Sequence, residues 1–267
     1  MDPTITKGYQ ALKERKDYII VFLLPIDAFW LENEFNFEVS LRLLPLRNQL
    51  KVKNQKYFRD RCLGLGNQLL LVYVLWLMNQ SWSIEQVLSR LHHGSNGKPM
   101  FEDVDFNLSN DKESLLNSMA IAGGTVGLDT INFHLINRQF VDEIKLGTLH
   151  DSELALLEKQ TEEEDYLRLF AQLWSLKESY TKYLGTGLIG VDLKQLEFRN
   201  VRLITTAGDS NTGIQLYIDG KRKVLGAIMT RLYNDQVYYS VVTDKDSPSL
   251  QEIVVGLKDL CSVLNNI

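Results

Sequence analysis

Apolar runs in the first half of the chain predict strands, one long helix and the turns between them. Strands are predicted at residues 19–24, 114–121 and 126–131. The apolar content rises along residues 60–78, which predicts a helix that becomes fully buried at its end. The sequence Ser83-Ile84-Glu85-Gln86 has the spacing of a capping box and predicts a short helical turn. Gly123-Gly124 is the sharpest break in mid-chain.

The second half of the chain begins with a helical pattern and returns to strands. Helices are predicted at residues 151–160 and 163–184, with Gly185 as the C-cap of the second. Four strands are predicted, at residues 199–205, 213–218, 223–229 and 236–243. Asp219-Gly220 favours a hairpin between two of them. A capping box at 249–252 and apolar positions at helical spacing predict an amphipathic C-terminal helix over 249–265.

This order of elements predicts an α+β fold with a boundary near residue 124. The two parts, 1–124 and 125–267, are similar in length. A chain of 267 residues is long enough for one large domain or two modest ones. We therefore expect an N-terminal lobe and a C-terminal lobe.

Composition narrows the class of protein. The chain is 45% hydrophobic and 24% charged, with a net charge of -5, which excludes disorder as its main feature and gives no general attraction to nucleic acid. The two cysteines have no motif and suit a reducing compartment. The longest apolar run, Leu69 to Met78, is about half a membrane span. We expect a cytoplasmic protein that binds no membrane and no nucleic acid.

Three polar stretches are candidates for chemistry, and each also has an ordinary structural interpretation. The turn Gly97-Lys98-Pro99 combines an ammonium with backbone N–H groups that are able to hold a phosphate, although a solvated turn is commoner. Asp129 follows apolar strand residues, where metal ligands and turn formers are equally common. Trp174, Glu178 and Lys182 share one helix face, either as a surface ion pair or at the edge of a cleft.

Taken in order, these motifs resemble a known family. They are Gly-Lys-Pro (97–99), Phe-Asn-x-Ser (106–109), Val-Gly-x-Asp (126–129) and Trp-x-x-Lys-Glu-Ser-x-x-Lys-x-x-Gly-x-Gly-Leu (174–188). The sequence resembles the 4'-phosphopantetheinyl transferases of the two-lobed, surfactin-synthetase-activating type, and the last two motifs are the specific ones. The resemblance implies two similar α+β lobes related by a pseudo-twofold, with the active site in the cleft between them. It also implies transfer of the phosphopantetheine arm of coenzyme A to a carrier-protein serine, with release of 3',5'-ADP.

The resemblance also assigns roles to residues. Asp129 and Glu178 match the carboxylates that bind Mg²⁺, with Mn²⁺ as an alternative. Glu178 also matches the residue that orients or deprotonates the serine, and Lys182 matches the lysine that contacts the pyrophosphate. Coenzyme A binding is assigned to Lys51, His93, Gly94, Ser95, Asn96, Gly97, Lys98, Asn107, Leu108, Ser109, Asn110, Asp129 and Lys182.

Further stretches resemble the fungal members of this family that serve lysine biosynthesis. They lie at residues 44–46, 58–62, 68–70 and 173–182. This similarity implies that the acceptor is the apo carrier domain of α-aminoadipate reductase. We also expect a monomer, because nothing in the sequence demands a dimer. Two alternatives stay open: an enzyme that serves a broad range of carriers, and a non-catalytic relative that binds CoA or a carrier. The second is motivated by Ile131 and Asn110, which stand where many members have an acid and a histidine.

Overall fold

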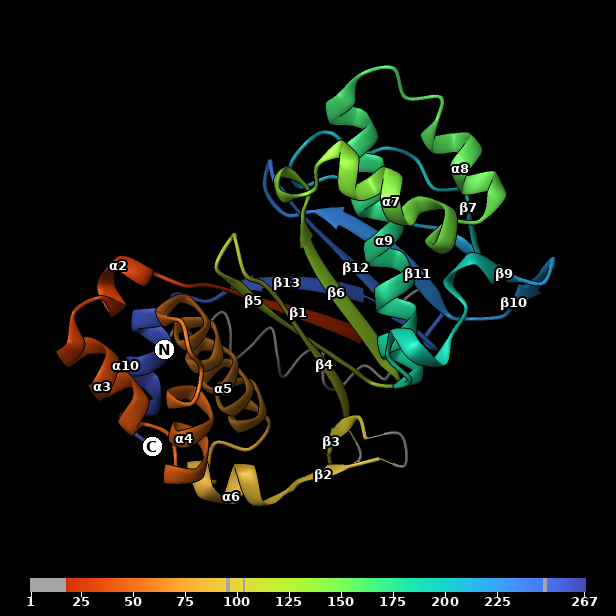
Figure 1. Cartoon of the computed structure of the whole chain (residues 1–267). Helices are drawn as coiled ribbons and strands as arrows, with labels where there is room; N and C mark the ends of the chain where they lie inside the picture. Colours follow the sequence, from red (N-terminus) through yellow and green to blue (C-terminus); the bar gives the residue numbers. More distant parts are fainter. Residues whose placement is uncertain (1–17, 95–96, 103, 247–248) are drawn as a thin grey trace. The chain divides into compact units, whose positions relative to one another are not determined.

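The computed structural model describes residues 18–94, 97–102, 104–246 and 249–267 (Figure 1). Contacts divide the chain into two compact units. The first unit contains the described residues up to Gly123 together with Ser249–Ile267, and the second begins at Gly124. Both units combine helices with antiparallel strands, so the predicted α+β class is confirmed.

The first unit is a six-stranded sheet with helices packed on it. The sheet order is β13-β1-β5-β4-β3-β2, with bounds β1 (Tyr18–Pro25), β2 (Leu91–His93), β3 (Pro99–Phe101), β4 (Val104–Asp111), β5 (Leu116–Ala122) and β13 (Ser249–Val254). The helices are α2 (Ala28–Leu31), α3 (Glu34–Arg42), α4 (Leu46–Lys53), α5 (Phe58–Met78), α6 (Ile84–Ser89) and α10 (Leu257–Leu264). The predicted capping box is present at the start of α6, where Ser83 and Gln86 exchange hydrogen bonds.

Helix α5 forms the centre of the first unit's core. By length and composition it is apolar enough to cross a membrane, yet 72% of its most apolar window is buried inside the protein. Its buried residues pack with Ile20, Phe22 and Met119 from the sheet. Asn117 of β5 also donates a hydrogen bond to the Leu63 carbonyl at 3.2 Å. The apolar run that looked like half a membrane span is therefore a core helix.

Within its described residues, 124–246, the second unit contains two small sheets and three α-helices. One sheet has the order β6-β12-β11-β8, and the other β10-β9-β7. The strands are β6 (Val126–Asn132), β7 (Leu196–Arg199), β8 (Ser210–Asn211), β9 (Gln215–Ile218), β10 (Lys221–Lys223), β11 (Ala227–Leu232) and β12 (Val237–Thr243). The helices are α7 (Arg138–Thr148), α8 (Asp151–Leu157) and α9 (Glu163–Leu184), with 3-10 turns η1 (Phe133–Leu135), η2 (Leu188–Gly190) and η3 (Leu193–Gln195).

Helix α9 has the bounds that the sequence predicts, and it packs along β6 and β12 (Figure 1). An apolar stripe that includes Leu169, Phe170, Leu173 and Leu176 is buried in the second core, as its helical spacing requires. Gly185 ends the helix in the left-handed conformation, with φ 71°, because glycine has no Cβ to oppose it. The predicted Asp219-Gly220 hairpin joins β9 and β10, and both residues have positive φ.

Three predictions about strands and helices are wrong. The single strand predicted at 223–229 is interrupted, because β10 ends at Lys223 and β11 begins only at Ala227. Residues 249–254 form β13, which pairs in parallel with β1, and the C-terminal helix begins only at Leu257. As a result, residues 249–267 belong to the first unit, whereas the sequence predicted that they belong to the second. The strand predicted at 199–205 is shifted, because β7 ends at Arg199.

Candidate active site

Strand β6 and helix α9 bring together three of the residues expected to be functional. Asp129 lies on β6, and Glu178 and Lys182 lie one helical turn apart on α9. The Lys182 Nζ is 2.7 Å from the Asp129 Oδ1, a charge-assisted hydrogen bond across 53 positions of sequence. Asp129 is buried, whereas Lys182 and Glu178 are partly exposed. The fold thus places both predicted carboxylates and the predicted cation beside one another.

Gly127 explains how the strand and the helix come close enough for this contact. A Cβ on Gly127 would lie 2.0 Å from the Ser179 carbonyl oxygen and 2.4 Å from the Tyr183 nitrogen, both of them backbone atoms of α9. Residues two apart on a strand point to the same face, so Gly127 and Asp129 both face the helix. The glycine of Val-Gly-x-Asp therefore admits the helix backbone, and the aspartate two residues later reaches the helix side chains.

The electrostatics of Glu178 differ from those of a surface carboxylate. Its pKa is raised to about 6, first by burial and second by the nearby Asp129 charge, while Lys182 acts in the opposite direction. Among the described residues, none forms a hydrogen bond or ion pair with the Glu178 carboxylate. The charges of these three side chains, two carboxylates and one ammonium, sum to -1 when all three are ionised. Such a cluster favours a further cation.

The residues predicted to bind the nucleotide lie in the first unit. His93 is the last residue of β2, and Gly94 directly after it donates a hydrogen bond from its nitrogen to the Lys98 oxygen at 2.9 Å. Gly97 has φ 76°, which few other residues tolerate. Ser95 and Asn96 lie outside the described residues. Lys98 forms an ion pair with Asp105 at 2.5 Å. The Gly-Lys-Pro motif gave no indication of this acidic partner.

Strand β4 carries the next group of predicted CoA residues. Asn107 and Ser109 are buried polar side chains that alternate with Phe106 and Leu108. Phe106 and Leu108 pack with the core around α5, so the two polar side chains lie on the other face of the sheet. Asn110 is exposed at the end of this strand, and Lys51 is exposed on α4. The contacts of all these residues with coenzyme A stay predictions.

Comparison with known proteins agrees with this geometry. A family model described as the 4'-phosphopantetheinyl transferase superfamily matches residues 125–227, a range that includes Asp129, Glu178 and Lys182. The chain is 33% identical to the L-aminoadipate-semialdehyde dehydrogenase-phosphopantetheinyl transferase of Candida glabrata, over 68% of this chain and 70% of that protein. The chain belongs to the 4'-phosphopantetheinyl transferase superfamily. Its second unit therefore holds the motifs of a phosphopantetheinyl transferase.

Other members of the superfamily are similar over both units. The protein of the same name from Saccharomyces cerevisiae is 30% identical over 71% of this chain and 70% of its own length. The human protein of that name is 22% identical over 86% of this chain and 76% of its own length. The predicted family and transferase class are therefore confirmed.

The donor set of this transferase site suits a hard divalent cation. No group of three or more His, Cys, Asp or Glu side chains that could hold a metal is found in the part of the chain that the structure describes. Asp129 and Glu178 supply two carboxylates, and Mg²⁺ is commonly held by one or two carboxylates together with substrate phosphates and water. Ile131, on the same strand face as Asp129, packs against the second core and adds no ligand. The residues present thus fit a metal that completes its coordination with substrate oxygens.

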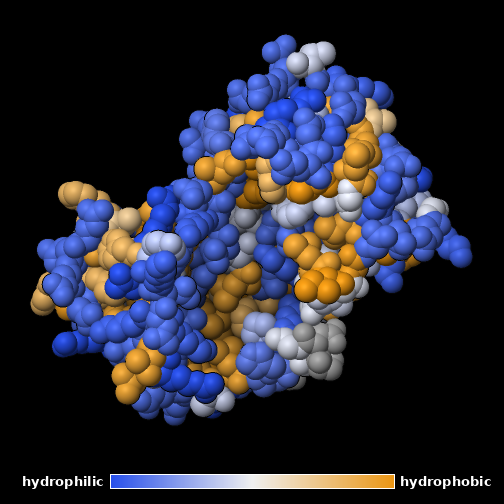
Figure 2. Space-filling model, viewed as in Figure 1, coloured by the Kyte–Doolittle hydropathy of each residue, from blue (hydrophilic) through white to orange (hydrophobic). Residues whose placement is uncertain are grey.

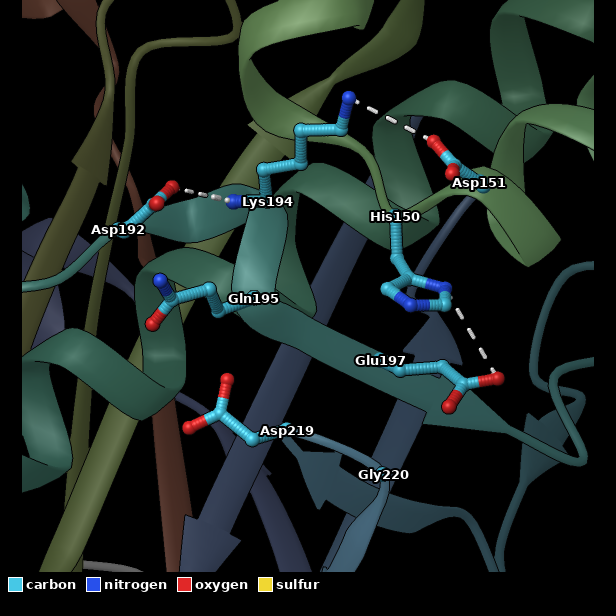
Figure 3. Close-up of a pocket in the computed structure, with 8 residues that line it drawn as sticks. All are labelled: His150, Asp151, Asp192, Lys194, Gln195, Glu197, Asp219 and Gly220. Atoms are coloured by element: carbon cyan, nitrogen blue, oxygen red, sulfur yellow. Dashed lines mark hydrogen bonds and ion pairs between the residues drawn. The ribbon is translucent and has the colours of Figure 1, made fainter.

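A separate polar cavity of about 270 Å³ lies in the same unit (Figure 3). It is lined by His150, Asp151, Asp192, Lys194, Gln195, Glu197, Asp219 and Gly220. The Lys194 ammonium lies 3.5 Å from Asp151, and the Asp192 carboxylate accepts a hydrogen bond from the Lys194 backbone nitrogen. Glu197 is held by Arg199 at 2.7 Å, which lowers the pKa of Glu197. This cavity shares no residue with the Asp129 cluster. The contacts of Asp151, Asp192 and Glu197 hold η3 and β7 in place.

Proposed function

We propose that this chain transfers the 4'-phosphopantetheine arm of coenzyme A to a serine of a carrier domain in L-aminoadipate-semialdehyde dehydrogenase, the α-aminoadipate reductase of lysine biosynthesis. The contact between Asp129 and Lys182 beside Glu178 carries the proposal for the reaction. The names of the relatives support the choice of acceptor. The Asp129 cluster provides the charges that transfer of a phosphoryl-linked group requires.

The reaction needs little covalent chemistry from the protein. The serine oxygen forms a bond to the phosphorus that carries pantetheine, and the pyrophosphate bond breaks, so that 3',5'-ADP leaves with the bridging oxygen. The serine proton must go to a base. With its pKa raised to about 6, the Glu178 carboxylate is ionised near neutral pH and is able to accept that proton or orient the hydroxyl.

Lys182 is suited to the leaving group. Its ammonium is held at 2.7 Å by Asp129, so its direction is fixed before the substrate binds. A fixed cation stabilises the charge that develops on the diphosphate oxygen without first reorganising. Asp129 and Glu178 would hold Mg²⁺, or Mn²⁺ as an alternative. When bound, the metal would neutralise pyrophosphate charge and act as a Lewis acid.

The test of the reaction is the intact mass of an apo carrier domain after incubation with this protein, CoA and Mg²⁺. We expect a gain of one phosphopantetheine that is lost with EDTA. Glu178→Gln and Asp129→Asn should abolish the gain, whereas Glu163→Gln should not, because Glu163 is exposed on the first turn of the same helix. Full activity in Glu178→Gln would contradict the site.

The test of the acceptor compares carriers side by side. We expect a higher kcat/KM on the carrier domain of L-aminoadipate-semialdehyde dehydrogenase than on a fatty-acid or polyketide carrier. Equal values would indicate a broad-range enzyme. Binding of CoA without any transfer, on a carrier that another transferase modifies, would indicate a non-catalytic relative.

A further inference from the structure

The turn that follows α9, the helix that carries Glu178 and Lys182, exposes apolar side chains. Ile189 is completely exposed, and Leu188 is 40% exposed. Both lie in the stretch Thr186–Gly190, which begins four residues after Lys182. Figure 2 shows apolar surface near the C-terminal end of α9. A fully exposed isoleucine leaves its whole apolar side chain in contact with water, which is unfavourable unless a partner covers it.

This turn has a defined conformation. The Gly185 nitrogen donates to the Lys182 oxygen at 3.1 Å, and the Thr186 nitrogen donates to the Thr181 oxygen at 3.2 Å. These two bonds fold the chain back on the last turn of α9. Gly187 has φ 62°, and a Cβ on Gly190 would lie 2.7 Å from the Thr186 Cβ, so the turn closes tightly on itself. The glycines therefore fix where the two apolar side chains stand.

A buried ion pair anchors the chain on the far side of the turn. The Lys177 Nζ is 2.7 Å from the Glu153 carboxylate, and both side chains are essentially inaccessible. The same ammonium donates to the carbonyl oxygens of Leu193 at 2.9 Å and Leu196 at 2.5 Å. Both carbonyls belong to the segment that follows the turn. The stretch between Gly185 and Leu193 is thus tied at both ends to α9.

We infer that the exposed turn Thr186–Gly190 is a contact surface for the carrier domain, an inference that rests on the proposed function. The nucleophile of that reaction is part of a folded protein, so the surface around its serine must come against the residues that border the Asp129 cluster. Leu188 and Ile189 offer that surface an apolar contact six and seven residues after Lys182 in the chain. Because hydrogen bonds already fix the backbone of this turn, little conformational entropy is lost when a partner binds it. The occupant is the apolar surface of the carrier beside its serine.

The double variant Leu188→Ser/Ile189→Ser tests this inference by steady-state kinetics on an apo carrier domain. We expect the KM for the carrier to rise by about 10- to 100-fold, since two buried contacts are lost, while the KM for CoA and kcat at saturating carrier stay unchanged. Val224→Ser is the matched control, because Val224 is 87% exposed in the same unit and lies outside this turn. Circular dichroism should show both variants folded.

Three results would overturn the inference. An increase in the KM for CoA would mean that the turn contacts the pantetheine arm of CoA. Unchanged constants, or an equal effect in Val224→Ser, would mean that the turn has no specific partner. Direct binding of a fluorescently labelled carrier separates this inference from the proposed function. A wild type that binds the carrier without modifying it would refute the reaction and not the contact surface. Equal binding by the wild type and the double variant would have the same meaning as unchanged kinetic constants and would refute the contact surface.

Discussion

Gly127→Ala is the most informative single change, because it tests whether the close approach of β6 and α9 creates the active site. Gly127 has no positive φ, so alanine fits its extended backbone and the effect is purely steric. The added Cβ would meet the Ser179 oxygen at 2.0 Å and the Tyr183 nitrogen at 2.4 Å. Backbone atoms in a packed helix have no rotamer through which to escape. The helix or the strand must therefore move.

The size of the movement follows from these distances. Ordinary contact begins at 3.4 Å, so the helix must withdraw by about 1.4 Å along the line to the Ser179 oxygen. Such overpacking costs about 1–3 kcal/mol of folding stability. A displacement of this size is enough to lengthen the 2.7 Å contact between Lys182 and Asp129 beyond hydrogen-bond distance. Misplacement of catalytic groups by about 1 Å costs on the order of 10²-fold in rate.

Two measurements on the purified variant check these values. Urea unfolding should show the loss of about 1–3 kcal/mol, and transfer to an apo carrier should fall by about 10²-fold in kcat under conditions where the protein is folded. The matched control is Gly147→Ala, in α7 of the same unit, where an added Cβ meets nothing within 4 Å. That change should leave activity intact and stabilise the helix by about 0.5–1 kcal/mol.

The reasoning fails if Gly127→Ala is folded, less stable and fully active, because the active-site geometry would then be independent of the close approach. It also fails if the variant is as stable as the wild type, because the contact with backbone atoms would not be rigid. Loss of activity with unchanged stability would contradict the overpacking argument, since both effects arise from the same displacement.

Other variants test the charges on both sides of α9. Lys177→Met should lower the free energy of unfolding in urea by about 3–5 kcal/mol, because the Glu153 charge is left buried without its partner. The second substitution Glu153→Leu should recover most of that loss. A double variant as unstable as Lys177→Met would show that the ion pair itself stabilises the unit. Lys182→Ala should lower kcat by about 10²–10³-fold in the transfer assay, with little change in the free energy of unfolding. A change in KM alone would exclude a role of Lys182 in stabilising the transition state. In EDTA, Glu178→Gln should be about 1 kcal/mol more stable than the wild type at pH 7.5 and equal to it near pH 4. The sign follows because the Glu178 pKa of the folded wild type is raised from 4.5 to about 6. The protonated carboxyl stabilises the folded wild type, and this stability is lost as the pH rises through 6, whereas glutamine does not titrate. The full shift corresponds to about 2 kcal/mol, and partial exposure of Glu178 reduces it to about 1 kcal/mol. Equal pH profiles for the two proteins would refute the raised pKa.

Local patterns were sufficient where neighbouring residues decide the structure. Helix α9 begins and ends as predicted because an apolar stripe and a left-handed Gly185 specify it within one segment. The C-terminal segment shows the limit of local patterns. Ile253 and Val255 are buried while Val254 is half exposed, the alternation of a strand. The same residues also fit a helical stripe, and only pairing with β1, more than 200 positions earlier, selects the strand.

The candidate site was predictable as a set of residues but not as a geometry. The motifs identified Asp129, Glu178 and Lys182, whereas their contacts depend on the packing of a strand against a helix about 50 positions away. The role of Gly127 was missed, although its two-residue offset from Asp129 already placed both on one strand face. Asp105, the partner of Lys98, was missed because no motif links the two positions.

The adjacent residues Lys177 and Glu178 divide the Lys-Glu motif into two different roles. Successive positions on a helix point about 100° apart, so one residue can face the core while the next borders solvent. Lys177 faces the core, where burial lowers its pKa and Glu153 opposes that effect. Glu178 faces the Asp129 cluster, where its carboxylate is bound by none of the residues that the structure describes and has a raised pKa. The orientation of α9 about its axis therefore places both the buried Lys177–Glu153 ion pair and the Asp129 cluster. A substitution in the ion pair affects the reacting groups only if it rotates or displaces α9.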